Sequence, residues 1–209
     1  MKTIVLDFDD FSVLNNRLDL LLRLKESYPE LKVSFFTIPY DYVYENDISA
    51  RLMRENTLKE VKKHLDWMEF IPHGLTHFPR EFEQTTYDTM KNYVFKAIDE
   101  CFERDGLPYI KGFKAPQWLW NEQVVKALDE EGWWGAIDLF DKTGLKTNKY
   151  YQYTHTIDMP FWESTYDTLK LHGHITLESK NNIERCFHML FKMPEDAEFK
   201  FASEMLEEK

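Results

Sequence analysis

The chain is poor in cysteine: its 209 residues contain only Cys101 and Cys186, which form no C-x-x-C pair. Two separated thiols cannot build a disulfide framework, so a reducing compartment is expected. No apolar run approaches the roughly 20 residues that a membrane-spanning helix requires. The first residues, "MKTIVLDFDD", contain no apolar segment typical of a secretory signal. These absences favour a cytoplasmic protein that does not interact with membranes.

Basic residues are also scarce. Lys and Arg number 26 against 37 Asp and Glu, which gives a net charge of −11. Proteins that bind nucleic acids neutralise phosphates with clustered Lys and Arg, so a nucleic-acid partner is not expected. The sequence contains no internal repeat, low-complexity stretch or linker rich in Pro and Gly. Its hydrophobic content of 43% is enough for one substantial core. We therefore predict a single catalytic domain spanning residues 1–209.

Apolar residues recur with helical and strand periodicity in alternation along the chain. Strands are predicted at 2–8, 31–39, 67–73, 109–116, 133–138, 155–160 and 169–176. Helices are predicted at 18–28, 48–65, 86–104, 121–132 and 180–192. This alternation is typical of an α/β fold with parallel strands, either an incomplete (β/α) barrel or a doubly wound sheet. Both folds place their active sites at the carboxyl ends of the strands.

Residues that could take part in catalysis or metal binding lie at the predicted ends of four strands. They are Asp7, Asp9 and Asp10 in "DFDD", His73 and His77 in "HGLTH", Lys114 and Pro116 in "KAP", and His172 and His174 in "LHGH". Parallel strands bring their carboxyl ends to one edge of a sheet. We therefore expect these side chains to meet at a single site.

The spacing of four between His73 and His77 brings both rings to one side if the chain turns helically after Pro72. Imidazoles suit zinc, iron, cobalt or nickel, and one carboxylate completes a three-ligand set. Gly74 and Leu75 stand where a zincin-type protease has its Glu. The stretch is therefore not the H-E-x-x-H motif of that class.

Carboxylates at the end of a buried strand are costly unless a cation, a proton or solvent compensates them. A hydrophobic strand ending in D-x-D resembles the first motif of haloacid-dehalogenase-type phosphatases. In that interpretation Asp7 is the nucleophile, Asp9 is the acid and base, and magnesium is the metal. The family motif continues with a small residue and then Thr, whereas Phe11 and Ser12 follow here. This interpretation also leaves "HGLTH" without a function.

Taken in chain order, the stretches resemble the polysaccharide deacetylase family (carbohydrate esterase family 4, the nodulation-deacetylase homology domain). "DFDDF" aligns with a first motif like T-F-D-D-G, and "VSFFTIP" is similar to the second strand. "HGLTH" matches the H-[ST]-x-x-H motif as H-x-x-x-H. "FKAP" resembles F-R-x-P, and "LKLHGH" resembles the last motif, L-x-H. The resemblance covers most of residues 2–192 and implies a distorted, incomplete (β/α) barrel.

The resemblance also implies roles for individual residues. The metal ligands would be Asp10, His73 and His77. Asp9 is the general base that takes a proton from the attacking water, and His172 is the general acid that protonates the departing amine.

Other positions follow the family less closely. Lys114 stands where the family has Arg, so the positive charge beside Asp9 is kept while the planar fork is lost. Phe11 stands where the family has Gly. Pro116 and His174 are expected on the substrate side of the site, and Asp141 aligns loosely with the acidic fourth motif.

The function that the resemblance implies is a metal-dependent hydrolase that removes acetyl groups from an N-acetylated carbohydrate. Its cofactor would be one divalent metal ion, with zinc favoured over iron, cobalt or nickel. Two alternatives stay open. One is the magnesium-dependent phosphatase that uses Asp7 and Asp9. The other is a catalytically weak barrel that binds glycans, which the Lys114 replacement favours.

Overall fold

A computed structural model describes residues 2–40, 48–140, 143–160 and 164–209. Its strands are β1 (Thr3–Phe11), β2 (Val33–Thr37), β3 (Met68–Pro72), β4 (Gly112–Lys114), β5 (Trp134–Ile137), β6 (Lys149–Gln152), β7 (His155–Thr156), β8 (Thr168–His174), β9 (Glu198–Lys200) and β10 (Glu207–Glu208). Its longer helices are α1 (Leu18–Ser27), α2 (Ile48–Val61), α4 (Phe95–Asp105), α5 (Glu122–Glu130) and α6 (Ile183–Leu190).

The strands form two sheets in which nearly all pairs are parallel. One sheet has the order β3-β2-β1-β8-β7 with β9 also paired to β1, and the other has the order β10-β6-β5-β4. Only β10 and β6 pair antiparallel among the described strands. A single parallel bridge between His73 and Lys114 joins the end of β3 to the end of β4. The two sheets therefore meet at the predicted site.

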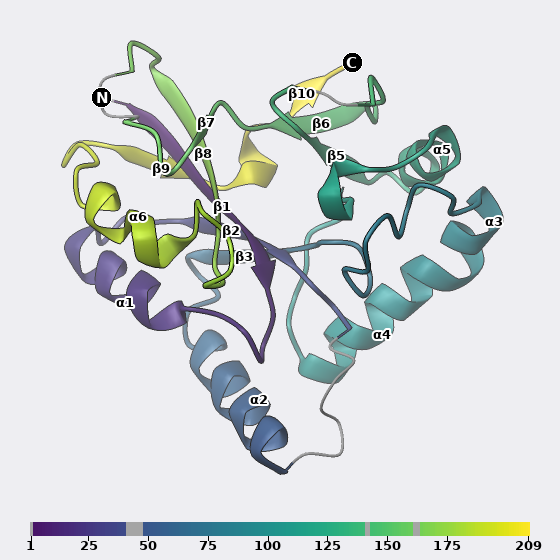
Figure 1. Cartoon of the computed structure of the whole chain (residues 1–209), viewed down its shortest axis with the longest axis horizontal. Coiled ribbons are helices and arrows are strands. Elements are labelled where there is room, and N and C mark those ends of the chain that lie inside the picture. The colour runs from purple at the N-terminus through teal and green to yellow at the C-terminus, as the bar shows by residue number, and fades with distance from the viewer. Residues whose placement is uncertain (1, 41–47, 141–142, 161–163) are drawn as a thin grey trace.

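The helices cover the outer side of these sheets (Figure 1). Helices α1 and α6 lie against each other on one side of the molecule, and α3 (Tyr87–Thr89), α4 and α5 lie on the other. Ile4, Leu6 and Phe8 of β1 belong to the large core that includes the apolar faces of these helices. Because side chains alternate along a strand, Val5 points to the opposite face of β1 and belongs to a second apolar cluster. Asp7 and Asp9 lie on the same face as Val5. That second cluster consists of Val5, Phe36, Ile71, Trp134, Ala136, Tyr151, Tyr153 and Ala202.

Local signals explain where the predicted helices begin and end. The side chain of Asn121 accepts hydrogen bonds from the backbone N–H groups of Gln123 and Val124, as expected for an N-cap. Gly106 ends α4 in the left-handed conformation, with φ of 59°. The helix predicted at 86–104 is interrupted by a π-helical turn, η1 (Met90–Val94), which joins α3 to α4.

The α/β class and the parallel strands are confirmed. Strands β6, β9 and β10 were not predicted, because each spans only two to four residues and periodicity is weak over that length. Closure of the sheets into a distorted barrel stays a prediction. Among the described residues, no helix combines the length and the apolar character needed to cross a membrane.

Candidate metal and catalytic site

The carboxyl end of β1 contains a β-bulge that places Asp9 and Asp10 on the same side. Phe8 is paired with Phe35, but the next partners along β2 are Phe11 and Thr37, so β1 has one extra residue there. Asp10 occupies the left-handed region, with φ of 62°. Adjacent residues of a regular strand face opposite ways, so the bulge is what brings the two carboxylates together.

Phe11 follows the bulge and explains why glycine is not needed after the aspartates. The positive φ falls on Asp10, a residue type that tolerates this region better than most. Phe11 is fully buried and its ring centroid lies 4.7 Å from that of Phe35 and 5.5 Å from that of Phe70. The bulge is therefore anchored by aromatic packing.

Asp10, His73 and His77 converge as the sequence predicted. Oδ1 of Asp10 lies 3.0 Å from Nε2 of His77 and 3.4 Å from Nε2 of His73. This oxygen is buried, yet it makes no hydrogen bond of acceptable geometry with any residue that the structure describes. Burial alone would raise the pKa of Asp10, but the two imidazoles hold it well below its ordinary value. The three donor atoms have the composition and proximity of a metal-ligand set.

The segment that carries His77 is a loop, so the helical turn that would bring both rings together after Pro72 does not form. Gly74 and His77 both have positive φ, 65° and 59°, which no helix contains. The carboxylate of Glu81 holds the loop by accepting hydrogen bonds from the backbone N–H groups of Leu75 and Thr76, at 3.2 and 3.1 Å. The ring centroids of His73 and His77 are 4.7 Å apart, so the loop achieves what a helix was expected to do.

Gly74 is the residue that lets this loop form, and Gly74→Ala is expected to lower the free energy of unfolding by about 1–3 kcal/mol. A Cβ at this position would lie 2.6 Å from Oε2 of Glu81 and 2.7 Å from Cγ of Pro116, in addition to the strain of the positive φ. Denaturant unfolding measures the loss. Gly132→Ala is a matched control, because Gly132 has a φ of 70° but nothing near its Cβ position. An equal effect in both variants would contradict the steric argument.

Lys114 lies beside Asp9, where the sequence comparison placed it. Its ammonium group donates a hydrogen bond to Oδ1 of Asp9, and both side chains are buried. Nζ lies 3.6 Å from the ring centroid of Trp118 and 4.7 Å from that of Phe36, a cation–π arrangement. Burial lowers the pKa of Lys114 and opposes the ionisation of Asp9. The charge of Lys114 nevertheless keeps the pKa of Asp9 below its ordinary value.

Lys114 occupies only one oxygen of Asp9. The other oxygen, Oδ2, lies 3.6 Å from Nε2 of His73 and 3.8 Å from Nε2 of His172. Asp9 therefore stands between His172 and the three candidate metal ligands, the place that its predicted role requires.

Asp7 has a function that the sequence did not reveal: it holds His172. Nδ1 of His172 lies 2.6 Å from Oδ1 of Asp7, and the hydroxyl of Tyr151 donates to Oδ2 of Asp7 at 2.7 Å. Asp7 and His172 are register partners on neighbouring strands. Burial raises the pKa of Asp7 to about 6, against the opposing effects of Lys114 and Tyr151. Burial, aided by Lys114, lowers the pKa of His172.

These pKa directions favour one protonation state of the pair near neutral pH. Asp7 is ionised, and His172 is neutral with its proton on Nδ1, where the Asp7 carboxylate accepts it. Nε2 of His172 therefore faces Oδ2 of Asp9, 3.8 Å away.

The two predicted substrate-side residues differ in their surroundings. His174 is the register partner of Asp9 and is partly exposed, with Nε2 4.0 Å from Oδ2 of Asp10. Pro116 is buried and packs close to Gly74, so its visible role is to support the loop. Contact of either residue with a substrate stays a prediction. Asp141 lies outside the described residues.

Sequence reasoning placed Asp7 at this site but not as the partner of His172, and it missed Tyr151 and Glu81. For Asp7 the signal was present, because residues 7 and 9 share a face in a strand. Tyr151 lies on a strand that was not predicted. Glu81 had no local signal, since its role depends on the shape of the loop before it.

Comparison with known proteins gives matches only at the level of structure. No family model matches the sequence, and no curated protein matches it. Among solved structures, the Xyl-CE4 domain of a multidomain xylanase from the hindgut metagenome of Trinervitermes trinervoides has a TM-score of 0.57 at 15% identity. The alignment covers 98% of this chain and 89% of that chain.

Two further structures extend the comparison. The Bc1960 peptidoglycan N-acetylglucosamine deacetylase has a TM-score of 0.61 at 15% identity, over 97% of this chain and 87% of that chain. BA3943, a CE4 family pseudoenzyme from Bacillus anthracis, has a TM-score of 0.57 at 14% identity, over 97% of this chain and 64% of that chain. The chain therefore has the fold of the family 4 carbohydrate esterases, as its motifs predicted.

Proposed function

We propose that the protein is a metal-dependent hydrolase that removes acetyl groups from an N-acetylated carbohydrate. The observation that carries this proposal is the position of Asp9. One oxygen is held by Lys114, and the other faces both the Asp10–His73–His77 set and His172. A metal-ligand set, a base and an acid are thus adjacent, as amide hydrolysis requires.

The three ligands fit a divalent ion such as zinc. The buried Oδ1 of Asp10 lacks a hydrogen bond, and two imidazole nitrogens stand within 3.4 Å of it. The left-handed φ of both Asp10 and His77 is strain of about 1–3 kcal/mol at each residue, which is typical of functional sites. When bound, the ion would lower the pKa of a water and polarise the acetyl carbonyl. Zinc, iron, cobalt and nickel all suit these ligands.

Asp9 is assigned the first proton transfer. Lys114 keeps the pKa of Asp9 low, against the effect of burial, and occupies its Oδ1. The free Oδ2 therefore accepts the proton of the attacking water. The C–O bond to the acetyl carbon then forms. In the second half of the reaction the C–N bond breaks, and the products are acetate and an amine.

His172 is assigned the second proton transfer. An amine leaves readily only when protonated. Nε2 of His172 faces Oδ2 of Asp9 at 3.8 Å, so it takes up the proton that Asp9 accepted from the water and passes it to the departing nitrogen. Asp7 stabilises the imidazolium that this role requires and keeps the ring oriented through Nδ1. Tyr151 in turn holds Asp7.

Asp7→Asn is expected to lower kcat by about 10²-fold or more with little change in KM. The amide nitrogen of Asn would face Nδ1 of His172 and favour the opposite tautomer, which protonates Nε2 without a carboxylate to support it. Steady-state kinetics measure the effect. Metal content is a second readout, because the hydrogen bonds described for the Asp7 side chain are to His172 and Tyr151 and not to the ligand set. Tyr151→Phe, which removes only one hydrogen bond to Asp7, should lose far less activity. Equal activity of Asp7→Asn and the wild type would contradict the role.

The phosphatase alternative is not favoured by the position of Asp7. A nucleophilic aspartate needs a free oxygen facing the substrate, but Asp7 is 1% exposed and both its oxygens are engaged by His172 and Tyr151. Substitution of Asp7 does not separate the two reaction classes, because the proposed deacetylase also depends on this residue. An assay for phosphate release with magnesium separates them directly.

The fold alone does not exclude a non-catalytic protein, because one protein with this fold is described as a pseudoenzyme. The site residues have to decide between the two. The residues to which we assign the base, the acid and the metal are all present in this chain and lie close together. We therefore favour turnover over binding alone.

The test is release of acetate from N-acetylated oligosaccharides, and from acetylated xylan for comparison, by protein reconstituted with zinc or cobalt. Metal-dependent acetate release is the expected result. A metal-loaded protein that binds the oligosaccharide but releases no acetate would contradict the proposal and favour a glycan-binding protein.

A further inference from the structure

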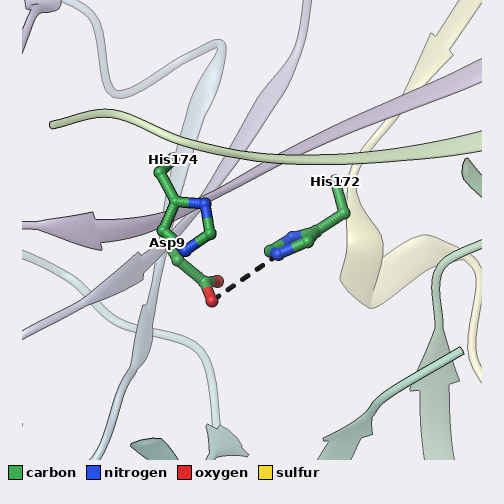
Figure 2. Close-up of side chains that lie close together, drawn as sticks. All are labelled: Asp9, His172 and His174. Carbon is green, nitrogen blue, oxygen red and sulfur yellow. Dashed lines mark ion pairs between the residues drawn. The ribbon is translucent and has the colours of Figure 1, made fainter. Parts of the chain in front are cut away.

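A second group of potential metal ligands adjoins the first. Figure 2 shows Asp9 of β1 with His172 and His174 of β8, the strand that pairs with β1. One potential ligand atom from each residue lies within 4.8 Å of those of the other two. This group shares no residue with Asp10, His73 and His77.

His172 is already oriented as a metal ligand would be. Its Nδ1 is bound to the carboxylate of Asp7 at 2.6 Å, and Nε2 points toward Oδ2 of Asp9 at 3.8 Å, the pair that Figure 2 joins by a dashed line. Histidines that bind metals typically donate their other nitrogen to a carboxylate, which fixes the tautomer and raises the basicity of the ring.

His174 contributes an unsatisfied polar atom. Its Nδ1 is buried and has no hydrogen-bond partner among the described residues, which is costly in a folded protein. The ring lies beside the carboxylate of Asp9 in Figure 2, and the side chain is 22% exposed. An ion can therefore reach this group from solvent.

The local charges make this second site weaker than the first. Asp7, Asp9 and Asp10 bring three negative charges near the site, against one positive charge on Lys114. A first divalent ion balances this sum, so a second ion adds repulsion from both the first ion and Lys114. Lys114 binds Oδ1 of Asp9, which leaves Oδ2 as the oxygen for the second ion.

We propose that Asp9, His172 and His174 form a second, weaker site for a divalent transition-metal ion, and that its occupation inhibits the protein. Inhibition rests on the proposed function, since the ion would hold the general base and the general acid together. The site itself depends only on the three donors. An N/O ligand set of two imidazoles and one carboxylate suits zinc better than magnesium or calcium.

The test is titration of the metal-free protein with Zn²⁺, followed by calorimetry and by metal content after equilibrium dialysis. Wild type should bind two ions, the second at least about tenfold more weakly because of the charge repulsion. His174→Ala should lose the weaker ion and keep the tight one. His188→Ala removes an exposed histidine of α6 and should keep both ions.

A single class of site in wild type would overturn the inference, as would a second ion that persists in His174→Ala. His174→Gln, a variant that keeps a polar side chain, guards against misfolding, which circular dichroism checks for both variants. In acetate-release assays, excess Zn²⁺ should inhibit wild type at concentrations that fill the second site. One tight ion with acetate release would overturn this inference and leave the proposed function standing. Two bound ions without acetate release would support this inference and contradict the proposed function.

Discussion

Asp9→Asn is expected to reduce acetate release by about 10² to 10⁴-fold, the usual contribution of a general base. Asparagine keeps the shape of the side chain but cannot accept the proton of the attacking water. The metal-ligand set of Asp10, His73 and His77 stays intact, so the tight ion should be retained. Loss of rate without loss of that ion is the distinctive result.

Steady-state kinetics and metal content of the same preparation check this prediction. Asp88→Asn is a matched control, because Asp88 is an exposed residue of α3. It should leave both the rate and the metal content unchanged. An Asp9→Asn variant with the activity of wild type would remove Asp9 from the mechanism.

Lys114→Met is expected to lower the free energy of unfolding by about 3–5 kcal/mol, the typical cost of removing one partner of a buried ion pair. Lys114 and Asp9 are 0% and 3% exposed, so the carboxylate left behind has no solvent to stabilise it. The variant also loses the contacts of Nζ with the rings of Trp118 and Phe36. Asp9 can relieve part of the cost by taking up a proton, which would abolish its role as a base.

Denaturant unfolding of the metal-free protein measures this effect. The double variant Asp9→Asn/Lys114→Met should recover much of the lost stability, because neither charge is then left unpaired. Lys126→Met, at an exposed position of α5, should change stability by no more than about 0.5 kcal/mol. A loss below about 1 kcal/mol in Lys114→Met would show that the buried pair is not balanced as described.

The sequence was informative about the site because the chemistry falls at strand ends. Hydrophobic periodicity located β1, β3, β4 and β8, and the topology of parallel strands then implied that their carboxyl ends meet. His73, His77, Asp10, Asp9 and His172 are indeed neighbours. His172 and His174 were predicted to face the same side because they lie two residues apart on a strand. Their pairing with Asp7 and Asp9 of β1 confirms this.

What the sequence could not provide was local backbone geometry. A regular strand would separate Asp9 from Asp10, and only the bulge on β1, anchored by Phe11, brings them together. The loop from Gly74 to His77 likewise depends on left-handed residues and on Glu81, which lies outside the motif. Such features result from tertiary packing, and no periodicity reports them.

The role of Asp7 illustrates a different limit. Its place in D-x-D matched the nucleophile of another enzyme class, yet burial and the pairing of β1 with β8 make it the partner of His172. Which side chain stands opposite a strand residue depends on register, and register is set by packing against the rest of the sheet.

The most direct test of the account is metal content per chain, measured by elemental analysis for wild type, Asp10→Ala and His73→Ala after dialysis. The account predicts about one tightly held zinc, iron, cobalt or nickel ion in wild type and its loss in both variants. No tightly bound transition metal in wild type, even after reconstitution, would contradict it. Equal retention by both variants would also contradict it.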